Sequence, residues 1–329
     1  MRFGVTGTNW ITDTFIEAAL AADGASITAV CSRKKETALA YAKKHELTHA
    51  YTSLEEMCEG GEIDAVYLAT PNAVHHEQVI TCLEKGIPVL CEKPLTATKV
   101  LAEKMIEASK THQVLLMEAM KSTSMPNFQR VKELLPEIGT IRQVRFQYGQ
   151  YSSRYDKFKA GEILNAFKPD MANGSLMDLG VYTLYPIISL FGPPDAIQSD
   201  STVLHTGVDG QGAVLLSYEG MNVTAGYSKI ADSFLPSEIA GEKGAIHIDR
   251  ISSPGKVTLL TRDGAIDHSV EQLKPSMSYE IEEFIKTAHA GKIESDINTH
   301  DISLRTVELM EQIRKQQGIV YPLDALDGE

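Results

Sequence analysis

The sequence predicts an α/β domain with a Rossmann dinucleotide-binding fold over residues 1–120, followed by an α+β domain over residues 121–329. Up to about residue 120, short apolar runs alternate with stretches of helical period, which is typical of βαβ units and a parallel sheet. Beyond Ser124, apolar and polar residues alternate at period two, which indicates a largely antiparallel, open sheet. A length of 329 residues also suits two domains.

In the first domain, apolar runs rich in Val, Ile, Leu and Ala predict strands, and glycines mark helix ends. The expected strands are Arg2–Thr6, Ser26–Cys31, Ala65–Ala69, Pro88–Cys91 and Val114–Glu118. The expected helices are Ile11–Ala22, Lys35–Lys44, Val74–Lys85 and Thr98–Lys110.

In the second domain, strands dominate and helices interrupt them. A hairpin turn is expected at Gly220-Met221. The expected strands are Ile141–Tyr148, Ala213–Glu219, Asn222–Lys229, Ala245–Asp249 and Val257–Thr261. The expected helices are Met125–Leu135, Ser175–Leu190 and Ile302–Lys315.

Composition excludes several function classes. A net charge of −13, with no basic run beyond Arg33-Lys34-Lys35, argues against nucleic-acid and anionic-lipid partners. No run approaches the roughly 18 apolar residues of a membrane helix, and the N-terminus lacks a signal peptide, so we expect no membrane partner and a cytoplasmic location. The cysteines fit neither a zinc pair nor a disulfide framework and are expected to be reduced, buried thiols. They are Cys31, Cys58, Cys82 and Cys91.

A glycine loop follows the first predicted strand and leads into a helix, whose N-terminal N–H groups suit a pyrophosphate. The loop reads Gly7-Thr8-Asn9-Trp10-Ile11. It departs from G-x-G-x-x-G/A, because Asn9 replaces the second glycine and Thr12 the third small residue. Asn tolerates a tight turn, although a phosphate then has to pass its side chain. An ordinary strand-to-helix turn remains the alternative.

At the tip of the second strand, NAD-binding domains carry an Asp or Glu that binds the ribose 2′-OH. Here Ser32 and Arg33 occupy that place. A hydroxyl and a cation suit a 2′-phosphate, so NADP is favoured over NAD. The alternative is a solvated charge run at a helix start.

Two further segments reach the carboxyl edge of the parallel sheet, where ligands of open α/β sheets bind. One, Thr70-Pro71-Asn72, follows the third predicted strand and leads to His75. The other, Glu92-Lys93-Pro94, follows the fourth and places a cation at the edge. The second domain adds the pattern Gly174-x-x-x-Asp178-x-Gly180-x-Tyr182.

In this order and spacing, these motifs resemble the Gfo/Idh/MocA oxidoreductases, and the resemblance spans both domains. It implies hydride transfer to or from a nicotinamide cofactor. Tyr182 stands where many members have His. This is similar to the branch with dihydrodiol dehydrogenase, xylose dehydrogenase and glucose–fructose oxidoreductase, which commonly uses NADP, rather than to the inositol dehydrogenases. The implied cofactor-binding residues are Gly7, Thr8, Asn9, Trp10, Ile11, Ser32, Arg33, Thr70, Pro71, Asn72, His75, Glu92 and Lys93.

The implied catalytic residues are Lys93, Asp178 and Tyr182, and their chemistry suits alcohol oxidation. A base must take the hydroxyl proton as hydride leaves, and a cation within about 4–6 Å lowers the pKa of a tyrosine base. Asp178 precedes Tyr182 by four residues on a predicted helix, so both side chains face one way. The plainer alternative makes Asp178 a surface charge and Tyr182 a core aromatic.

The predicted function is therefore an NADP-linked oxidoreductase of a small sugar, polyol or cyclic diol. A glycoside hydrolase that recycles NAD and a sensor that binds NADP without turnover are the rivals. The segment Tyr151–Asp170, with Arg154, Tyr155 and Lys168, is a candidate pocket wall. No metal is expected, because His45-Glu46-Leu47-Thr48-His49 matches H-E-x-x-H but leaves its short helix before the second histidine.

The family resemblance also implies a homodimer or higher homo-oligomer, formed through the sheets of the second domain. A strand face carrying Val223, Ala225 and Tyr227 is apolar enough to need cover. Packing against helices of the same chain would cover this face equally well.

Overall fold

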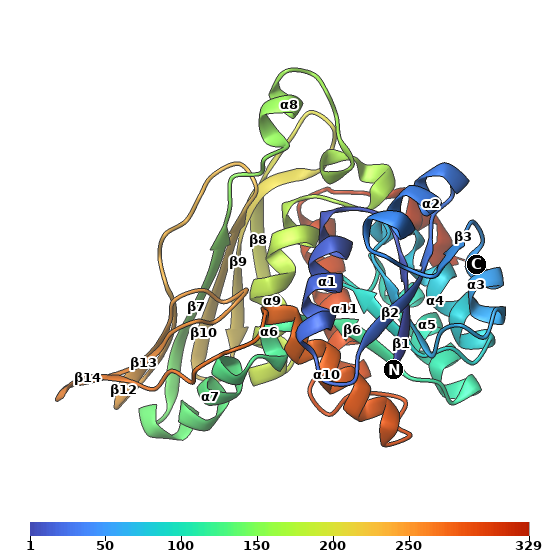
Figure 1. The fold of residues 1–329 in the computed structure, drawn as a ribbon. Coiled ribbons are helices and arrows are strands. Elements are labelled where there is room, and N and C mark those ends of the chain that lie inside the picture. Colours follow the sequence, from blue (N-terminus) through green and yellow to red (C-terminus); the bar gives the residue numbers. More distant parts are fainter. Residues whose placement is uncertain (329) are drawn as a thin grey trace. The chain divides into compact units, whose positions relative to one another are not determined.

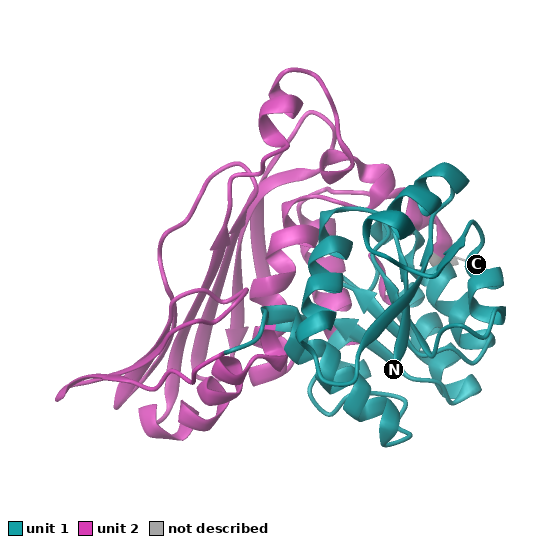
Figure 2. Cartoon of the chain, in the orientation of Figure 1, with its two compact units in different colours: residues 1–96, 100–121, 273–303 teal, residues 97–99, 122–272, 304–329 magenta. Residues whose placement is uncertain are grey.

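The computed structural model describes residues 1–328 and divides the chain into two compact units (Figure 2). Unit 1 comprises residues 1–96, 100–121 and 273–303, and unit 2 comprises residues 97–99, 122–272 and those from 304 onward. The second segment of unit 1 ends at residue 121, whereas the predicted division lies at residue 120. The stretch 273–303, which the sequence placed in the second domain, belongs to unit 1.

Unit 1 contains a six-stranded parallel sheet in the order β3-β2-β1-β4-β5-β6, which is the Rossmann order (Figure 1). Its strands are β1 (Arg2–Thr6), β2 (Ser26–Cys31), β3 (His49–Tyr51), β4 (Ala65–Leu68), β5 (Val89–Glu92) and β6 (Leu116–Ala119). Its helices are α1 (Trp10–Ala21), α2 (Lys35–Lys44), α3 (Leu54–Glu59), α4 (His75–Glu84), α5 (Lys99–His112) and α10 (Ser276–His289). The short elements β3 and α3 were not predicted.

Helix α10 was also missed, although Met277, Ile281 and Phe284 recur at helical spacing. It packs against α1 in the core of unit 1, where the Ser278 hydroxyl donates to the Ala18 carbonyl. Aromatic rings fill this core, and Phe3 lies 5.7 Å from the ring centres of both Phe15 and Phe284.

Unit 2 is built on an eight-stranded sheet in the order β14-β13-β12-β11-β7-β10-β9-β8, in which only β7 and β10 pair in parallel. Met221 pairs with Tyr218, so the hairpin turn is Glu219-Gly220 and not Gly220-Met221. The strands are β7 (Ile141–Gly149), β8 (Ala196–Val203), β9 (Asp209–Tyr218), β10 (Met221–Ser228), β11 (Ser237–Gly241), β12 (Gly244–Ile248), β13 (Val257–Thr261) and β14 (Gly264–Asp267). The sequence analysis missed β8, β11 and β14.

One helical stretch covers one face of this sheet. It begins as a turn of π-helix, Leu176–Gly180, and continues as α9 (Val181–Phe191) (Figure 1). Val223, Ala225 and Tyr227 are at most 3% exposed beneath it. The chain thus covers this apolar face with its own helix, as the alternative expectation held. The other helices are α6 (Lys121–Ser124), α7 (Pro126–Leu134), α8 (Tyr155–Lys159) and α11 (His300–Gln316).

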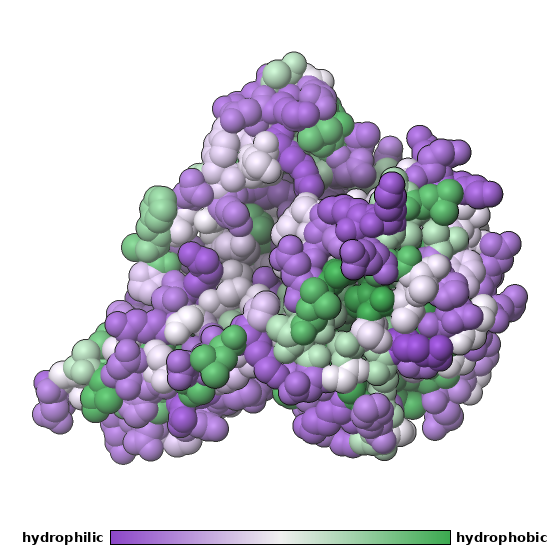
Figure 3. Space-filling model, viewed as in Figure 1, coloured by the Kyte–Doolittle hydropathy of each residue, from purple (hydrophilic) through white to green (hydrophobic). Residues whose placement is uncertain are grey.

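By length and composition alone, the 23 residues Pro169–Phe191 qualify as a candidate membrane span, which the sequence analysis did not anticipate. Their apolar window is 78% buried within the protein, as is typical of a core helix. On the face drawn in Figure 3, hydrophobic side chains form small separate patches among hydrophilic ones.

Candidate active site

The strand order of unit 1 brings four predicted segments to one edge. The loops after β2, β1, β4 and β5 follow each other across the sheet, and they carry Ser32, Gly7, Thr70 and Lys93. The strand order reverses between β1 and β4, which is where ligands of open α/β sheets bind.

Asn9, which replaces the second glycine of the loop, has a structural role there. Asn9 is the N-cap of α1: its Oδ1 accepts from the Ile11 N–H at 2.9 Å, and its Nδ2 donates to the Ala69 carbonyl at 2.9 Å. Gly7 has a φ of +83°, and a Cβ there would lie 2.5 Å from the Ala69 oxygen. The asparagine side chain therefore fastens the loop to the end of β4, and the loop fits a pyrophosphate at the N-terminus of α1.

The side chains expected beside a 2′-phosphate are accessible. Arg33 and Lys34 are exposed, and neither forms an ion pair with any of residues 1–328. Ser32 is half-buried, and its N–H donates to the Tyr51 carbonyl. Trp10, the first residue of α1, is 63% exposed.

His75 is completely buried and joins two loops of the edge. Its Nε2 lies 2.9 Å from the Thr70 carbonyl and its Nδ1 lies 3.1 Å from the Pro94 carbonyl. Burial lowers the pKa of His75, so the ring is neutral at pH 7 and donates to one carbonyl at a time. His75 thus holds the loops that carry Asn72 and Lys93.

Lys93 is half-buried above a cluster of buried acids. Glu92 accepts from the Tyr67 hydroxyl, and burial raises its pKa while the Lys93 ammonium opposes the rise. Glu280, on α10, is fully buried, and its two oxygens have no hydrogen-bond partner among residues 1–328. Burial raises its pKa well above the ordinary value, against the charges of Lys93 and Lys121. The cation of this edge therefore stands beside two buried carboxyl groups whose pKa values burial raises.

Unit 2 carries the other predicted catalytic residues, Asp178 in the π-turn and Tyr182 at the start of α9. Two glycines of their motif allow close approach. A Cβ on Gly174 would lie 2.2 Å from Asp209 Oδ1, and one on Gly180 would lie 3.1 Å from the Tyr227 ring. The motif is therefore also a packing requirement.

Asp209, which the sequence analysis missed, anchors the start of the π-turn. Its carboxylate accepts from the N–H groups of Ser175 at 3.0 Å and Leu176 at 2.6 Å. It is fully buried, and burial raises its pKa to about 6, against the opposing effect of Lys229.

Asp178 forms an ion pair with Lys229, at 3.0 Å between Oδ2 and Nζ. The Lys229 side chain is 2% exposed, whereas that of Asp178 is 37% exposed. Lys229 was also missed, although the sequence held a signal for it. It follows Val223, Ala225 and Tyr227 on the inward-facing positions of the strand, where a cation is unusual.

Tyr182 is 9% exposed, and the Tyr148 ring meets it edge-on with 5.6 Å between ring centres. The candidate pocket wall Tyr151–Asp170 folds around aromatic contacts, with 4.7 Å between the ring centres of Phe158 and Phe167. Whether Arg154, Tyr155 and Lys168 contact a substrate stays a prediction.

The sites that the sequence analysis set aside have structural roles. His45 caps the end of α2 and bonds Asp13 at 2.7 Å, while His49 lies on β3, so H-E-x-x-H does not lie on one helix. All four cysteines are buried thiols, as expected. Among residues 1–328, no cluster of His, Cys, Asp and Glu suits a metal.

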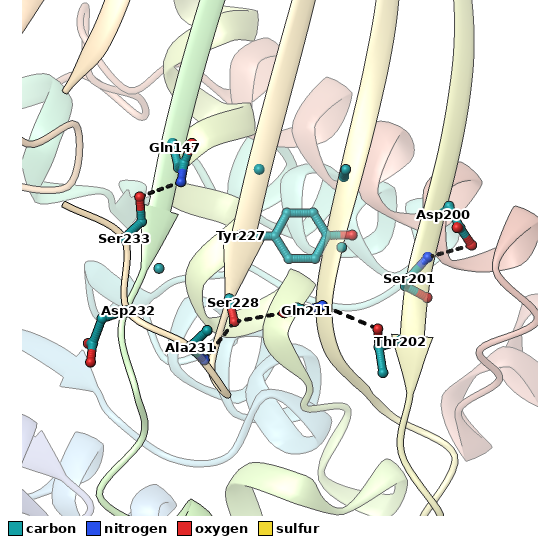
Figure 4. A pocket seen from close by; sticks show the side chains of 14 residues that line it. Gln147, Asp200, Ser201, Thr202, Gln211, Tyr227, Ser228, Ala231, Asp232 and Ser233 are labelled. Carbon is teal, nitrogen blue, oxygen red and sulfur yellow. Dashed lines mark hydrogen bonds between the residues drawn. The ribbon is translucent and has the colours of Figure 1, made fainter. Parts of the chain in front are cut away.

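A hollow opens at the ends of β7, β10, β9 and β8 in unit 2 (Figure 4). Gln147, Gln211 and Ser228 line it together with Asp200 and Asp232. None of the predicted catalytic residues lies there.

Two family matches agree with this geometry. Residues 1–120 match the family described as "Oxidoreductase family, NAD-binding Rossmann fold", and residues 128–247 match "GFO/IDH/MocA C-terminal domain". The chain belongs to the Gfo/Idh/MocA family. It is an NAD(P)-dependent oxidoreductase, as expected from its motifs.

Similar proteins include the scyllo-inositol 2-dehydrogenase (NADP(+)) IolU of Bacillus subtilis, 47% identical over 98% of this chain and 99% of that protein. The trans-1,2-dihydrobenzene-1,2-diol dehydrogenase of Xenopus laevis is 29% identical over 98% of this chain and 99% of that one. The fold resembles the 3-ketoreductase KijD10 of Actinomadura kijaniata in complex with NADP and TDP-benzene, with a TM-score of 0.85 at 22% identity over 96% of this chain and 98% of that one. The similar proteins thus include one named as an inositol dehydrogenase and others named as dihydrodiol dehydrogenases.

Proposed function

We propose that this protein is an NADP-linked dehydrogenase of a small cyclic polyol, with a sugar or cyclic diol as the next substrate class. The row of Gly7, Thr70 and Lys93 at the carboxyl edge of the parallel sheet carries the proposal: Gly7 and Thr70 flank the switch point, and Lys93 follows the neighbouring strand β5. The 47% identity to a protein named scyllo-inositol 2-dehydrogenase (NADP(+)) supports the cofactor and makes scyllo-inositol the first substrate to test.

In this proposal, bound NADP supplies the nicotinamide carbon that accepts or gives the hydride. Tyr182 takes the proton of the reacting hydroxyl, and the Lys93 ammonium favours the developing oxyanion. Asp178 accepts a hydrogen bond from a substrate hydroxyl. The loop at residues 7–11 and the Thr70-Pro71-Asn72 turn hold the cofactor, and His75 and Glu92 act through the loops that they fix.

Replacing Lys93 tests the mechanism. Lys93→Ala should lower turnover with scyllo-inositol by about 10²–10⁴-fold, since a general acid–base system loses its cation. NADP affinity should stay nearly unchanged. Lys104→Ala, an exposed lysine of the same unit, is the control. Unchanged turnover in Lys93→Ala would sink the mechanism.

The cofactor preference has its own test in the fluorescence of Trp10, the single tryptophan. NADPH should quench it at a lower concentration than NADH, and one net contribution of about 1.4 kcal/mol from Ser32 or Arg33 would make the preference tenfold. Arg33→Asp should reverse the order, while Arg262→Asp, an exposed arginine of unit 2, should not. Equal quenching by both nucleotides would overturn the NADP preference alone.

Net conversion of NADP also separates the proposal from its rivals, because a glycoside hydrolase recycles its cofactor and a sensor does not turn it over. A cytoplasmic location and a homodimer complete the proposal. Light scattering that finds only a 36.0 kDa species at micromolar concentration would overturn the proposed homodimer.

A further inference from the structure

Lys229 is a buried lysine that the proposed reaction does not use. It follows β10 at an inward-facing position, and its N–H donates to the Gly210 carbonyl at 2.8 Å. A side chain that is 2% exposed can carry an ammonium only where nearby oxygens replace water, because an isolated buried charge is very costly.

Oxygens from two parts of unit 2 surround this ammonium. Nζ donates to the Ala166 carbonyl at 3.1 Å, and the Gly174 carbonyl and Asn173 Oδ1 each lie at 3.4 Å. Asp178 Oδ2 lies at 3.0 Å, on the π-turn. Three N–H donors are thus shared among four acceptors.

Two further groups adjoin the cluster. The Phe167 ring centre lies 5.2 Å from Nζ, so the ammonium also faces an aromatic ring. The second carboxylate is Asp209, which is fixed by the Ser175 and Leu176 N–H groups. Lys229 therefore forms an ion pair with one carboxylate, Asp178, and lies near enough to a second, Asp209, to lower its pKa; of the two, only Asp178 reaches the surface.

We propose that Lys229 is a positioning residue, which holds the Asp178 carboxylate in place for a hydroxyl of the polyol substrate. Neutral donors would satisfy the carbonyls of the 166–174 segment, whereas a carboxylate is held and kept ionised best by a cation. Lys229 also ties Asp178 to the candidate pocket wall through Ala166 and Phe167. The inference rests on the proposed function, because it needs Asp178 to bind substrate.

A double-mutant cycle between Lys229 and Asp178 tests this role. Lys229→Met should raise the KM for scyllo-inositol on the order of 10–100-fold, since a slightly misplaced group costs up to about 10²-fold, while NADP affinity measured by Trp10 quenching stays within about twofold. In an Asp178→Asn background, Lys229→Met should change KM by less than about threefold, because the carboxylate that it positions is already gone.

The control is Lys99→Met, which removes another lysine of unit 2 from its ion pair, with Glu308 at 2.8 Å, and should leave KM unchanged. Effects of Lys229→Met and Asp178→Asn that simply multiply would overturn the inference, since Lys229 would then act only on the fold. A fall in NADP affinity would overturn it too. A wild-type protein that turns over no polyol would overturn both the proposed function and this inference, so the two failures are distinguishable.

Discussion

The two groups of proposed site residues are built in different ways. In unit 1, each proposed site residue stands within a few residues of the end of its strand. The order of the strands alone therefore brings Gly7, Ser32, Thr70 and Lys93 into one row. In unit 2, the surroundings of Asp178 come from segments distant in sequence, around residues 166–174, 209 and 229. The first arrangement follows from topology and the second from side-chain contacts.

The electrostatics differ as well. Lys93 stands beside Glu92 and Glu280, two buried acids whose pKa values burial raises. In unit 2, the buried cation Lys229 pairs directly with Asp178. Unit 1 thus offers the Lys93 ammonium to an anionic cofactor or an oxyanion, whereas unit 2 offers a fixed carboxylate to hydroxyl groups.

Removing the proposed base should have the largest effect on turnover. It should also separate the chemical step, which Tyr182 of unit 2 serves, from cofactor binding, which the loops of unit 1 serve. Tyr182→Phe should lower kcat by about 10²–10⁴-fold, because the proton acceptor is lost, while cofactor affinity stays within twofold. Steady-state kinetics and Trp10 quenching measure both quantities. Tyr218→Phe removes a hydroxyl that donates to the Gly192 carbonyl and should leave kcat unchanged. A wild-type kcat in the Tyr182→Phe enzyme would show that Tyr182 is not the base.

The motif glycines sharpen the comparison at the level of packing. Gly7→Ala should weaken NADP binding more than tenfold, because the new Cβ would lie 2.5 Å from the Ala69 oxygen and distort the loop.

Gly174→Ala should instead lower stability, because its Cβ would lie 2.2 Å from Asp209 Oδ1. We expect a loss of about 2–4 kcal/mol in the free energy of unfolding, while NADP affinity is kept.

Gly24→Ala is the matched control for Gly7→Ala. Gly24 has a φ of +80°, close to the +83° of Gly7, but open space around the position of its Cβ. Its substitution should cost about 1–2 kcal/mol of left-handed strain and leave NADP binding intact. Equal cofactor affinities in the two variants would show that the contact with Ala69 has no part in shaping the loop.

The same contrast explains what the sequence predicted. Strands β1, β2 and β13 have the predicted bounds, and each proposed group of unit 1 lies on its expected loop, because apolar runs and glycines are local signals. Helix α10 was not predicted, although its helical period is present in the sequence. No local pattern indicates that residues 273–303 return to unit 1.

The surroundings of Asp178 were harder to predict. The sequence identified Asp178 and Tyr182 through a motif, but Asp209 and Lys229 belong to no motif and meet Asp178 or its turn only after the sheet has formed. Lys229 at an inward strand position was the one available signal, since buried charges need partners.

Each unit contains a buried acid whose titration should affect stability. Burial raises the pKa of Glu118 in unit 1 to about 7 and that of Asp209 in unit 2 to about 6, above ordinary values of 4.5 and 3.8. The folded state therefore binds more protons than the unfolded state between these values, so stability falls as pH rises through them. These two acids should contribute roughly 1–3 kcal/mol more to the free energy of unfolding at pH 5 than at pH 8. His75, His76 and His300 act in the opposite direction, because burial lowers their pKa values, so the contribution of the acids is measured as the difference between the wild-type profile and that of each variant. Urea unfolding across this range measures it. Glu118→Gln should flatten the profile mainly between pH 5 and about 7.5, and Asp209→Asn mainly between pH 4 and about 6.5. Below about pH 4, stability should instead fall as the pH falls. Hydrogen bonds to Lys44, Tyr41 and His45 lower the pKa of Asp13 to about 2, against its partial burial. Protonation of Asp13 in this range therefore removes its contribution to the free energy of unfolding. A profile that keeps its slope in both variants would show that neither buried acid sets the pH dependence of its unit.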